Sequence, residues 1–406
     1  MKSPSIRTHQ IARALEDHFE VAVLTSLSEL GGFDAVVAQK LPYALARRLR
    51  RGGTRVVYDL YTPNWLEALA ILEAAPTDDL LLRLARVEAY SQELALASGD
   101  AFVCTSERQR DYWLGVLAKL GRLDIDAFGR DPTFRDLIDV VHFGLPVERP
   151  VAGERVLKGV VPGIDDGDFI LLWAGGILNW TDPLTVIRAV LEVARSRPAV
   201  KLVFLGVDPA DPDLPVAARE AVELSSSLGV LGRTVFFHSW VPYEQRSGFL
   251  LESDVGVAAY LDLVETRLAY RARLLDYFWA GLPTVTTGGD TLGELVSERQ
   301  LGRAVGFRDV AGWTDAIREL IDDEEARRRA KENLEAIRSE LAWPRVVEPL
   351  VRLLRAPTLP ISRPRPARLH SAVDRFERLR LSFAMRGPLG AARAQLARLG
   401  GRVAAR

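Results

Sequence analysis

The sequence predicts an α/β protein with two Rossmann-like, doubly wound domains in series. Short apolar runs rich in Val, Ile, Leu and Phe alternate with amphipathic stretches along the chain, as expected for parallel strands that are buried on both faces and separated by helices. Between Gly144 and Asp168 stand three Pro and four Gly, a composition typical of a linker. The pattern restarts after this stretch, so the chain is expected to divide there.

The apolar runs are the expected strands, and the amphipathic stretches between them are the expected helices. The clearest helical stretches are 6–15, 182–196 and 243–253. The predicted strands are Val21–Thr25, Ala35–Gln39, Arg55–Leu60, Ala101–Cys104, Val140–Phe143, Phe169–Ala174, Lys201–Leu205, Val235–His238, Val255–Ala259, Thr284–Thr287 and Ala304–Phe307.

These elements define five expected segments. Residues 1–148 form a first domain that binds the acceptor, 149–165 a linker, and 166–340 a second domain that binds a nucleotide. Residues 341–356 are expected to form a helix that returns toward the first domain, and 357–406 form a basic tail rich in Pro and Arg.

The start of the chain departs from the usual order of strand, turn and helix. Ile6 to Leu15 already has a helical pattern, and only five residues precede it. The first strand of such a sheet lies in its middle, so its omission would leave unpaired backbone groups beside a gap. We expect a truncated start; the alternative is that a later segment fills the gap.

The chain has 406 residues and is 48% hydrophobic, which excludes a fully disordered protein. Its net charge of -1 hides a split, because residues 360–406 hold eleven Arg and two acids whereas residues 1–359 hold 42 basic and 52 acidic side chains. The overall neutrality argues against a protein whose whole surface binds nucleic acid, and the split leaves an acidic body with a basic tail. The single cysteine, Cys104, fits a reducing cytoplasm. The five histidines lack metal-ligand spacing, so no metal site is expected.

The segment 265–290 carries the most informative pattern. Arg273 and Asp276 are three residues apart in an expected helix that ends in Gly-x-Pro, so they share one helix face. A guanidinium can bind phosphate oxygens in a fork and a carboxylate can accept two hydroxyl protons; the simpler alternative is a salt bridge. Gly288 and Gly289 follow the next strand and precede another helix.

A second candidate is the loop after the first strand of the second domain. Gly175 and Gly176 stand there, and their N–H groups could face a phosphate, although a plain tight turn has the same sequence. No Arg or Lys lies between Gly175 and Pro183, so phosphate charge would be met by backbone dipoles and by Arg271 or Arg273. Trp180, beside Asn179, would stack on a sugar or base, or pack between the domains.

In the first domain, Asp59 ends an expected strand, at the sheet edge where such folds place ligands. Asp59 would orient or deprotonate an acceptor hydroxyl. The equal alternative is that Asp59 caps the following helix or pairs with an arginine.

Together these segments resemble retaining glycosyltransferases of group 1, family 4-like and actinomycete-type, which have the two-domain GT-B fold. Their motif reads Lys, two residues, Glu, an aromatic residue, Met-Ala, x, Gly, x, Pro-Val-Val, and this chain has Arg273 in the Lys position and Asp276 in the Glu position. The resemblance covers most of 1–350 and includes 106–115, 141–144 and 175–183.

The resemblance implies a donor site in a cleft between the domains. Asp276 would hold the ribose and Arg273 would lie near the diphosphate. Donor-binding roles would extend to Gly175, Gly176, Asn179, Trp180, Arg271, Gly288 and Gly289. Asp59 and Glu265 would be the catalytic candidates.

Two departures from the family pattern qualify this assignment. Glu265 stands eleven residues before Asp276 instead of eight, and the alternative is that it is an exposed loop acid. Ser3-Pro-Ser5 stands where the group has a Gly-Pro-Gly-like loop after a strand.

The expected function is therefore that of a cytoplasmic bacterial enzyme of polysaccharide biosynthesis. It would transfer a sugar from a nucleotide-diphosphate sugar to a hydroxyl of a glycan, a lipid-linked acceptor or a small molecule, with retention, without a metal and without a cofactor. One alternative is a catalytically degenerate subunit that binds a partner or a membrane; another is a sugar-nucleotide epimerase of the same fold. Nucleic acid is not an expected partner.

The tail carries a separate signal. Apolar residues recur at helical spacing among arginines in 371–406, and a basic amphipathic helix can lie on anionic lipid. Peripheral contact with the inner face of the membrane is one expectation. A helix docked on the acidic body and a disordered extension are the alternatives.

Overall fold

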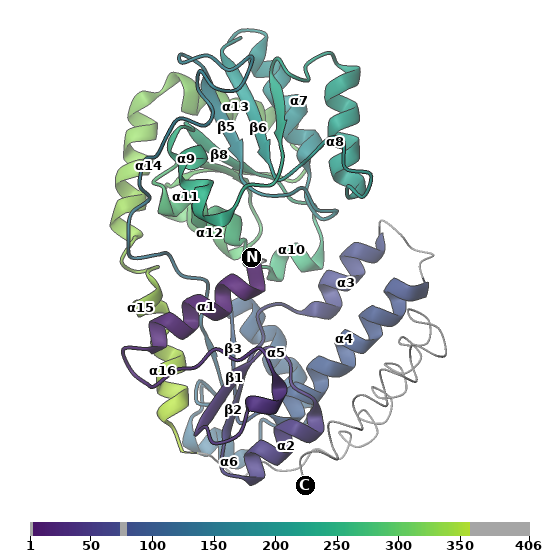
Figure 1. Ribbon diagram of the computed structural model, residues 1–406, viewed down its shortest axis with the longest axis vertical. Coiled ribbons are helices and arrows are strands. Elements are labelled where there is room, and N and C mark those ends of the chain that lie inside the picture. Colours follow the sequence, from purple (N-terminus) through teal and green to yellow (C-terminus); the bar gives the residue numbers. More distant parts are fainter. Residues whose placement is uncertain (1–2, 74–78, 358–406) are drawn as a thin grey trace. The chain divides into compact units, whose positions relative to one another are not determined.

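The computed structural model describes residues 3–73 and 79–357. It contains two parallel sheets, each with its own core, and the chain divides into two compact units. The four-stranded unit holds residues 24–140 and 350–357, and the six-stranded unit holds residues 3–23 and 141–349. The expectation of an α/β chain with two Rossmann-like sheets is confirmed (Figure 1).

The sheet of the four-stranded unit has the order β1-β2-β3-β4, and every neighbouring pair is parallel. β2 and β3 are buried along their whole length, as expected for strands covered by helices on both faces. The strands are β1 (Ala35–Ala38), β2 (Arg55–Asp59), β3 (Ala101–Cys104) and β4 (Ile138–Val140).

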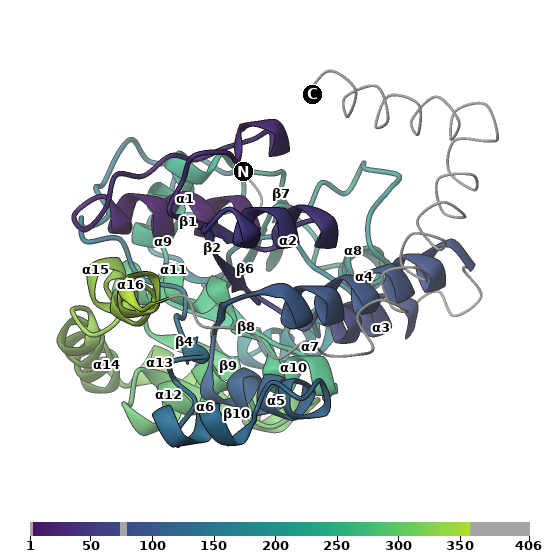
Figure 2. The ribbon, with the colours of Figure 1, turned by 90° about the horizontal axis from the view of Figure 1, so that it is seen from below.

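Helices surround this sheet, and the core between them includes Tyr58, Phe102 and Trp113. α3 and α4 pack against each other side by side, as Figures 1 and 2 both show. The helices are η1 (Leu27–Glu29), α2 (Tyr43–Arg51), α3 (Asn64–Glu73), α4 (Asp79–Ser98), α5 (Glu107–Lys119), α6 (Ile125–Arg130) and α16 (Glu348–Arg355).

The sheet of the six-stranded unit has the order β10-β9-β8-β5-β6-β7 and is also parallel. This is the order of a Rossmann sheet, in which the direction of winding reverses between β5 and β8. Ligands of such sheets bind beyond the carboxyl ends of the strands at that reversal. The strands are β5 (Phe169–Trp173), β6 (Val200–Leu205), β7 (Val235–His238), β8 (Val255–Ala258), β9 (Thr284–Thr287) and β10 (Gly302–Val305).

The core of this unit is formed by the strands together with α7 and α13, which pack against each other (Figure 1). Asp182 caps α7 by accepting from the N–H of Thr185, and Pro183 is its first residue, both common at helix starts. The helices are α1 (Ser3–Leu15), α7 (Pro183–Ala194), α8 (Val216–Ser227), η2 (Tyr243–Gln245), α9 (Arg246–Leu251), α10 (Val264–Leu268), α11 (Ala272–Trp279), α12 (Thr291–Glu298), α13 (Val310–Asp322), α14 (Glu324–Ile337) and α15 (Trp343–Val346).

One expectation about the first sheet is wrong for the described residues. Residues 21–25 form no strand and pair with none of the described strands, and the Val23 side chain is 44% exposed. In the described sheet β2 pairs directly with β3, and the truncated start stays a prediction. An apolar run forms a strand only where a neighbouring strand can complete its hydrogen bonds, and 21–25 has none among the described strands.

The expected domain boundaries also differ from the compact units. α1 groups with the six-stranded unit instead of the first sheet, and Arg7 Nη2 donates to the Val141 carbonyl oxygen at 2.7 Å. The expected return helix consists of α15 and α16. Most of α16 groups with the four-stranded unit, in which Arg352 forms an ion pair with Asp139.

The segment 149–165, expected to be a linker, contains no helix or strand but is packed against its unit. The carboxylate of Glu252 accepts hydrogen bonds from the N–H groups of Val156, Leu157 and Lys158 at 2.6, 3.0 and 2.9 Å. Lys158 also forms an ion pair with Asp254 at 3.1 Å. The Pro and Gly content indicated the absence of regular structure, but it carried no information about these side-chain acceptors.

Candidate functional site

The candidate site is centred on the turn that follows β5 in the six-stranded unit. Gly175 has a φ of +102°, a conformation that residues with a Cβ rarely adopt. A Cβ added at Gly175 would lie 3.6 Å from Arg273 Nε, and one added at Gly206 would lie 3.1 Å from Gly176 N. Glycine therefore allows this turn to bend and to lie against its neighbours at the carboxyl end of β5.

Arg273 is held against this turn. Its Nη2 donates to the Gly176 carbonyl oxygen at 2.5 Å, and its guanidinium lies 4.8 Å from the centre of the Trp173 ring. Its Nη1 is buried without a hydrogen-bond partner among the described residues. A buried cationic donor without an acceptor is costly, so an anionic ligand at this position would satisfy it.

Asp276 lies one turn further along α11 and is paired with Arg246. Arg246 Nε is 3.0 Å from Asp276 Oδ1, and the Arg246 guanidinium lies 4.5 Å from the centre of the Trp279 ring. The Asp276 side chain is 31% exposed. Burial among protein atoms raises the pKa of the Asp276 carboxyl above its ordinary value, although Arg246 and Arg273 act in the opposite direction.

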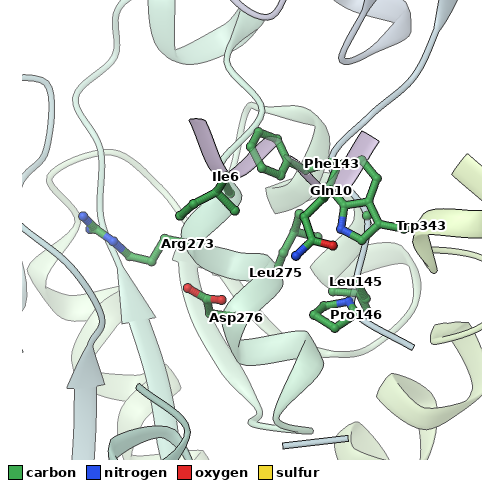
Figure 3. Close-up of a pocket in the computed structure, with 11 residues that line it drawn as sticks. Ile6, Gln10, Phe143, Leu145, Pro146, Arg273, Leu275, Asp276 and Trp343 are labelled. Carbon is green, nitrogen blue, oxygen red and sulfur yellow. The ribbon is translucent and has the colours of Figure 1, made fainter. Parts of the chain in front are cut away.

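Arg273 and Asp276 line a cavity of about 140 Å³ within the six-stranded unit. Figure 3 shows both residues on one side and Trp343 on the other, with Gln10 of α1 between them. The remaining lining is mostly apolar; the full set is Ile6, Gln10, Phe143, Gly144, Leu145, Pro146, Ala272, Arg273, Leu275, Asp276 and Trp343. The cavity thus combines an apolar wall with one cation and one anion.

Arg271 and Glu265 form a second, buried pair. Arg271 Nη2 is 3.2 Å from Glu265 Oε2, and Arg271 Nε is 3.6 Å from Asp290 Oδ2. The predicted role of Arg271 at a diphosphate stays a prediction, but its guanidinium already faces two carboxylates. Glu265 is 8% exposed, so the alternative of an exposed loop acid is wrong.

The other predicted donor residues have structural partners. The N–H of Gly288 donates to the Val305 carbonyl oxygen at 2.8 Å, so this N–H is used where β9 ends beside β10. Gly289 has a φ of +93°, which only glycine adopts easily. Asn179 Oδ1 accepts from Ala217 N at 3.5 Å, near the start of α8, and Trp180 is half-buried. Their roles in ligand binding remain predictions.

Asp59 lies at the carboxyl end of β2 in the four-stranded unit and is 4% exposed. Gln39 Nε2 donates to Asp59 Oδ2 at 3.3 Å. Nearby on α4, Glu88 forms an ion pair with Lys40 at 2.5 Å and accepts from Asn64 at 3.0 Å. The carboxyl edge of this sheet therefore presents hydrogen-bonding side chains, as expected for an acceptor site.

Two residues of the site were not among those predicted from the sequence. Arg246 opens α9, thirty positions before Asp276, and its contact depends on the tertiary fold. Asp290 caps α12 through Leu292 N and Gly293 N, and its place directly after Gly288 and Gly289 was the one available clue. Within 3–73 and 79–357, no cluster of His, Cys, Asp and Glu suits a metal ion.

None of the helices in the described part of the chain combines the length and the apolar character required to span a membrane. The basic stripes of 371–406 lie outside the described residues.

Comparison with known proteins shows which proteins this chain resembles. Residues 168–323 match the family model described as Glycosyl transferases group 1. A curated relative is D-inositol 3-phosphate glycosyltransferase of Nocardia farcinica, which is 24% identical over 281 residues and covers 67% of this chain. The chain spans 60% of the length of that relative.

Solved structures show the same fold. WaaG, a glycosyltransferase involved in lipopolysaccharide biosynthesis, superposes with a TM-score of 0.57 at 16% identity, over 88% of this chain and 97% of WaaG. HepE of Anabaena, solved with UDP and glucose, superposes with a TM-score of 0.53 at 15% identity, over 80% of this chain and 78% of HepE. The chain is thus similar to the group 1 glycosyltransferases over residues 168–323 and has a two-domain, Rossmann-like GT-B fold.

Proposed function

We propose that this protein transfers a glycosyl group from a nucleotide-diphosphate sugar to an acceptor hydroxyl. The contact of Arg273 with the turn at Gly175 and Gly176 is the observation that carries the proposal. It places a buried cationic donor at the carboxyl end of β5, beside the reversal of winding where Rossmann sheets bind nucleotides. The named activity of the Nocardia relative supports the same reaction.

Each residue is assigned a role that its side-chain chemistry allows. Arg273 offers its Nη1 donor to diphosphate oxygens, and Asp276 offers its carboxylate to the ribose hydroxyls. Asp59, in the other unit, orients or deprotonates the acceptor hydroxyl. Retention of configuration and independence from metal and cofactor belong to this proposal, and they follow from the resemblance.

The test is donor turnover by the purified full chain. UDP-, GDP- and ADP-sugars are supplied separately, and release of the nucleoside diphosphate is measured together with its binding by calorimetry. Arg273→Gln should lower the affinity for the nucleoside diphosphate at least tenfold. Arg188→Gln, on an exposed position of α7, serves as the matched control and should bind normally.

The outcomes separate the two functions that the sequence allows. Turnover with a defined sugar supports the enzyme. Tight nucleotide binding without turnover, across acceptor hydroxyls of glycans, lipids and small molecules, favours the degenerate subunit. Absence of both binding and turnover contradicts a nucleotide-sugar site.

We also propose that the basic tail brings the protein to anionic lipid. The charge of +9 over 360–406 supports this, because each Arg near such a surface adds about 1 kcal/mol. The full chain should sediment with phosphatidylglycerol vesicles and less with phosphatidylcholine vesicles. Replacing Arg393, Arg398 and Arg402 by Gln should reduce sedimentation, and an unchanged result would contradict the proposal.

A further inference from the structure

Arg246 of α9 lies over the ring of Trp279 and contacts Asp276. The guanidinium is 4.5 Å from the centre of the ring, and Nε is 3.0 Å from Asp276 Oδ1. A long arginine side chain loses conformational freedom when it is held in one place. The aromatic face beneath the guanidinium supplies a cation–π attraction that offsets part of this loss.

The Trp279 ring is itself held in place. Its Nε1 donates to the Glu148 carbonyl oxygen at 2.7 Å. Arg338 Nη1 donates to the Trp279 carbonyl oxygen at 3.1 Å, and Arg338 Nη2 donates to the same Glu148 oxygen at 3.0 Å. Since Trp279 is also 9% exposed, its ring is a fixed surface on which Arg246 can rest.

Asp276 and Trp279 both depart from the motif that the segment resembles. The motif has Glu in the position of Asp276 and Ala in the position of Trp279. Asp is one methylene shorter than Glu, so its carboxylate extends less far from α11. The two positions are three residues apart and share one face of the helix, so the large ring brings Arg246 against the shorter carboxylate.

The carboxylate held in this way is accessible. The hydrogen bond from Arg246 involves Oδ1, and the Asp276 side chain is 31% exposed, whereas that of Arg246 is 14% exposed. Asp276 lines the cavity of about 140 Å³ described above, and Figure 3 shows its carboxylate at the edge of that space. A ligand in the cavity can therefore contact Asp276 while Arg246 and Trp279 support it from the protein side.

We infer that Trp279 is a positioning residue, which holds the carboxylate of Asp276 at the cavity by way of Arg246. The inference rests on the proposed function, in which Asp276 accepts the ribose hydroxyls of the donor. Trp279 does not touch the ligand. It fixes Arg246 and Asp276 in advance, so that less freedom is lost when the ligand binds.

The first experiment measures how well the full chain distinguishes ribose from deoxyribose. Calorimetry gives the affinities for UDP, GDP and ADP and for their 2′-deoxy counterparts. Trp279→Ala should lower the affinity for the ribonucleotide about tenfold and that for the 2′-deoxynucleotide less than threefold, because only the former presents both hydroxyls to Asp276. Trp279→Phe, which keeps an aromatic face for Arg246, should retain most of the preference for ribose.

Combined variants test whether Trp279 acts through Arg246. The double variant of Trp279→Ala and Arg246→Ala should lose no more ribonucleotide affinity than the worse single variant; multiplicative losses would overturn the inference. Asp276→Glu should weaken binding in the wild-type background, where Arg246 is placed for the shorter carboxylate, and should weaken it less in Trp279→Ala. Equal losses in the two backgrounds would also overturn it.

Trp313→Phe is the matched control. Trp313 of α13 is fully buried and does not line the cavity, so this variant should have a lower Tm and an unchanged preference for ribose. Thermal unfolding identifies the variants that fold, and Trp279→Leu, which has no aromatic face, replaces Trp279→Ala if the latter does not fold.

The remaining outcomes are distinct. Equal losses of affinity for the two nucleotides in Trp279→Ala would give Trp279 a general structural role and overturn the inference. A wild-type chain that binds both nucleotides equally would overturn it as well. A wild-type chain that binds none of these nucleotides would instead contradict the proposed function, and the inference with it.

Discussion

Arg246 and Asp276 form an ion pair in which Nε lies 3.0 Å from Oδ1. Arg246 therefore holds one of the two oxygens of the Asp276 carboxylate, Oδ1. Because the Asp276 side chain is 31% exposed and lines the cavity, the carboxylate remains accessible to a ligand. Asp276, which is proposed to accept two ribose hydroxyls, is thereby fixed in orientation before a ligand arrives.

Affinity for a nucleoside diphosphate should fall in mildly acidic solution. Burial raises the pKa of Asp276, so the carboxylate acquires a proton at a higher pH than an ordinary aspartate and loses acceptor capacity. Removing Arg246, which lowers this pKa, should move the loss to still higher pH. Calorimetric titrations of the wild type and Arg246→Ala between pH 4.5 and 8, each compared with Asp276→Asn, measure the shift.

Asp276→Asn provides the control for this pH dependence. It should bind the nucleotide more weakly at neutral pH and should lack the acidic transition that is assigned to the carboxyl. A transition of the same size in Asp276→Asn would assign the titration to another group, and a transition that moves to lower pH in Arg246→Ala would contradict the sign.

Tyr277→Phe should destabilise the six-stranded unit and loosen the glycine turn. The Tyr277 hydroxyl lies 2.9 Å from the carbonyl oxygens of Leu172 and Val257 and accepts from Ala174 N at 2.9 Å. Phe leaves these buried groups without that partner, at a cost of about 1–3 kcal/mol. Since Ala174 directly precedes Gly175, nucleotide affinity should fall as well.

Urea unfolding and calorimetry measure the two effects of Tyr277→Phe. Tyr112→Phe is the control, because Tyr112 is half-buried and its hydroxyl has no hydrogen bond among those described. Its free energy of unfolding should change by about 0.5 kcal/mol or less. Equal effects of the two substitutions would contradict the role of the Tyr277 hydroxyl.

Glu252→Ala should destabilise the unit through the segment 149–165. Three backbone N–H groups donate to the Glu252 carboxylate, and losing donors to a charged acceptor costs about 2–3 kcal/mol here. Limited proteolysis should then cut within 149–165 more rapidly. Glu298→Ala, at an exposed position of α12, should have no effect, and similar cleavage rates in both variants would contradict the anchoring role.

The strands were predictable where hydrophobic runs had two neighbours in a sheet. β3 and β9, each with two neighbours in its sheet, have the bounds expected from the sequence, because burial on both faces leaves an uninterrupted signal. The pattern at 21–25 is equally apolar but forms no strand. Pairing depends on which segments lie alongside, which a local pattern does not contain.

The residues of the candidate site also differ in whether a local sequence pattern predicts them. Arg273 and Asp276 were predictable because their spacing on one helix carries the motif. Arg246 and Asp290 come from other helices, and their contacts arise from tertiary packing. Arg271 is predicted from the sequence as a cation near the phosphates, but the sequence does not show the two carboxylates that lie beside it.

Because of the lowered pKa of His142, the free energy of unfolding of the six-stranded unit should fall in mildly acidic solution. The ring stacks on Tyr270 with centres 5.6 Å apart, and its Nδ1 lies 3.1 Å from the Phe143 carbonyl oxygen. Burial and the charge of Arg7 lower the pKa of His142 below its ordinary value of 6.5, and the hydrogen bond to Phe143 offsets only part of this. As the pH falls below 6.5, the unfolded chain binds a proton that the folded chain does not, so stability is complete above 6.5 and declines through the lowered pKa.

His142→Phe keeps an aromatic ring against Tyr270 and removes the titrating group. The decrease in Tm between pH 7.5 and 5.5 should therefore be smaller in this variant than in the wild type. His18→Phe, at an exposed position after α1, should retain the wild-type decrease. If all three proteins lose the same Tm over this interval, the acid sensitivity of the unit arises from groups other than His142.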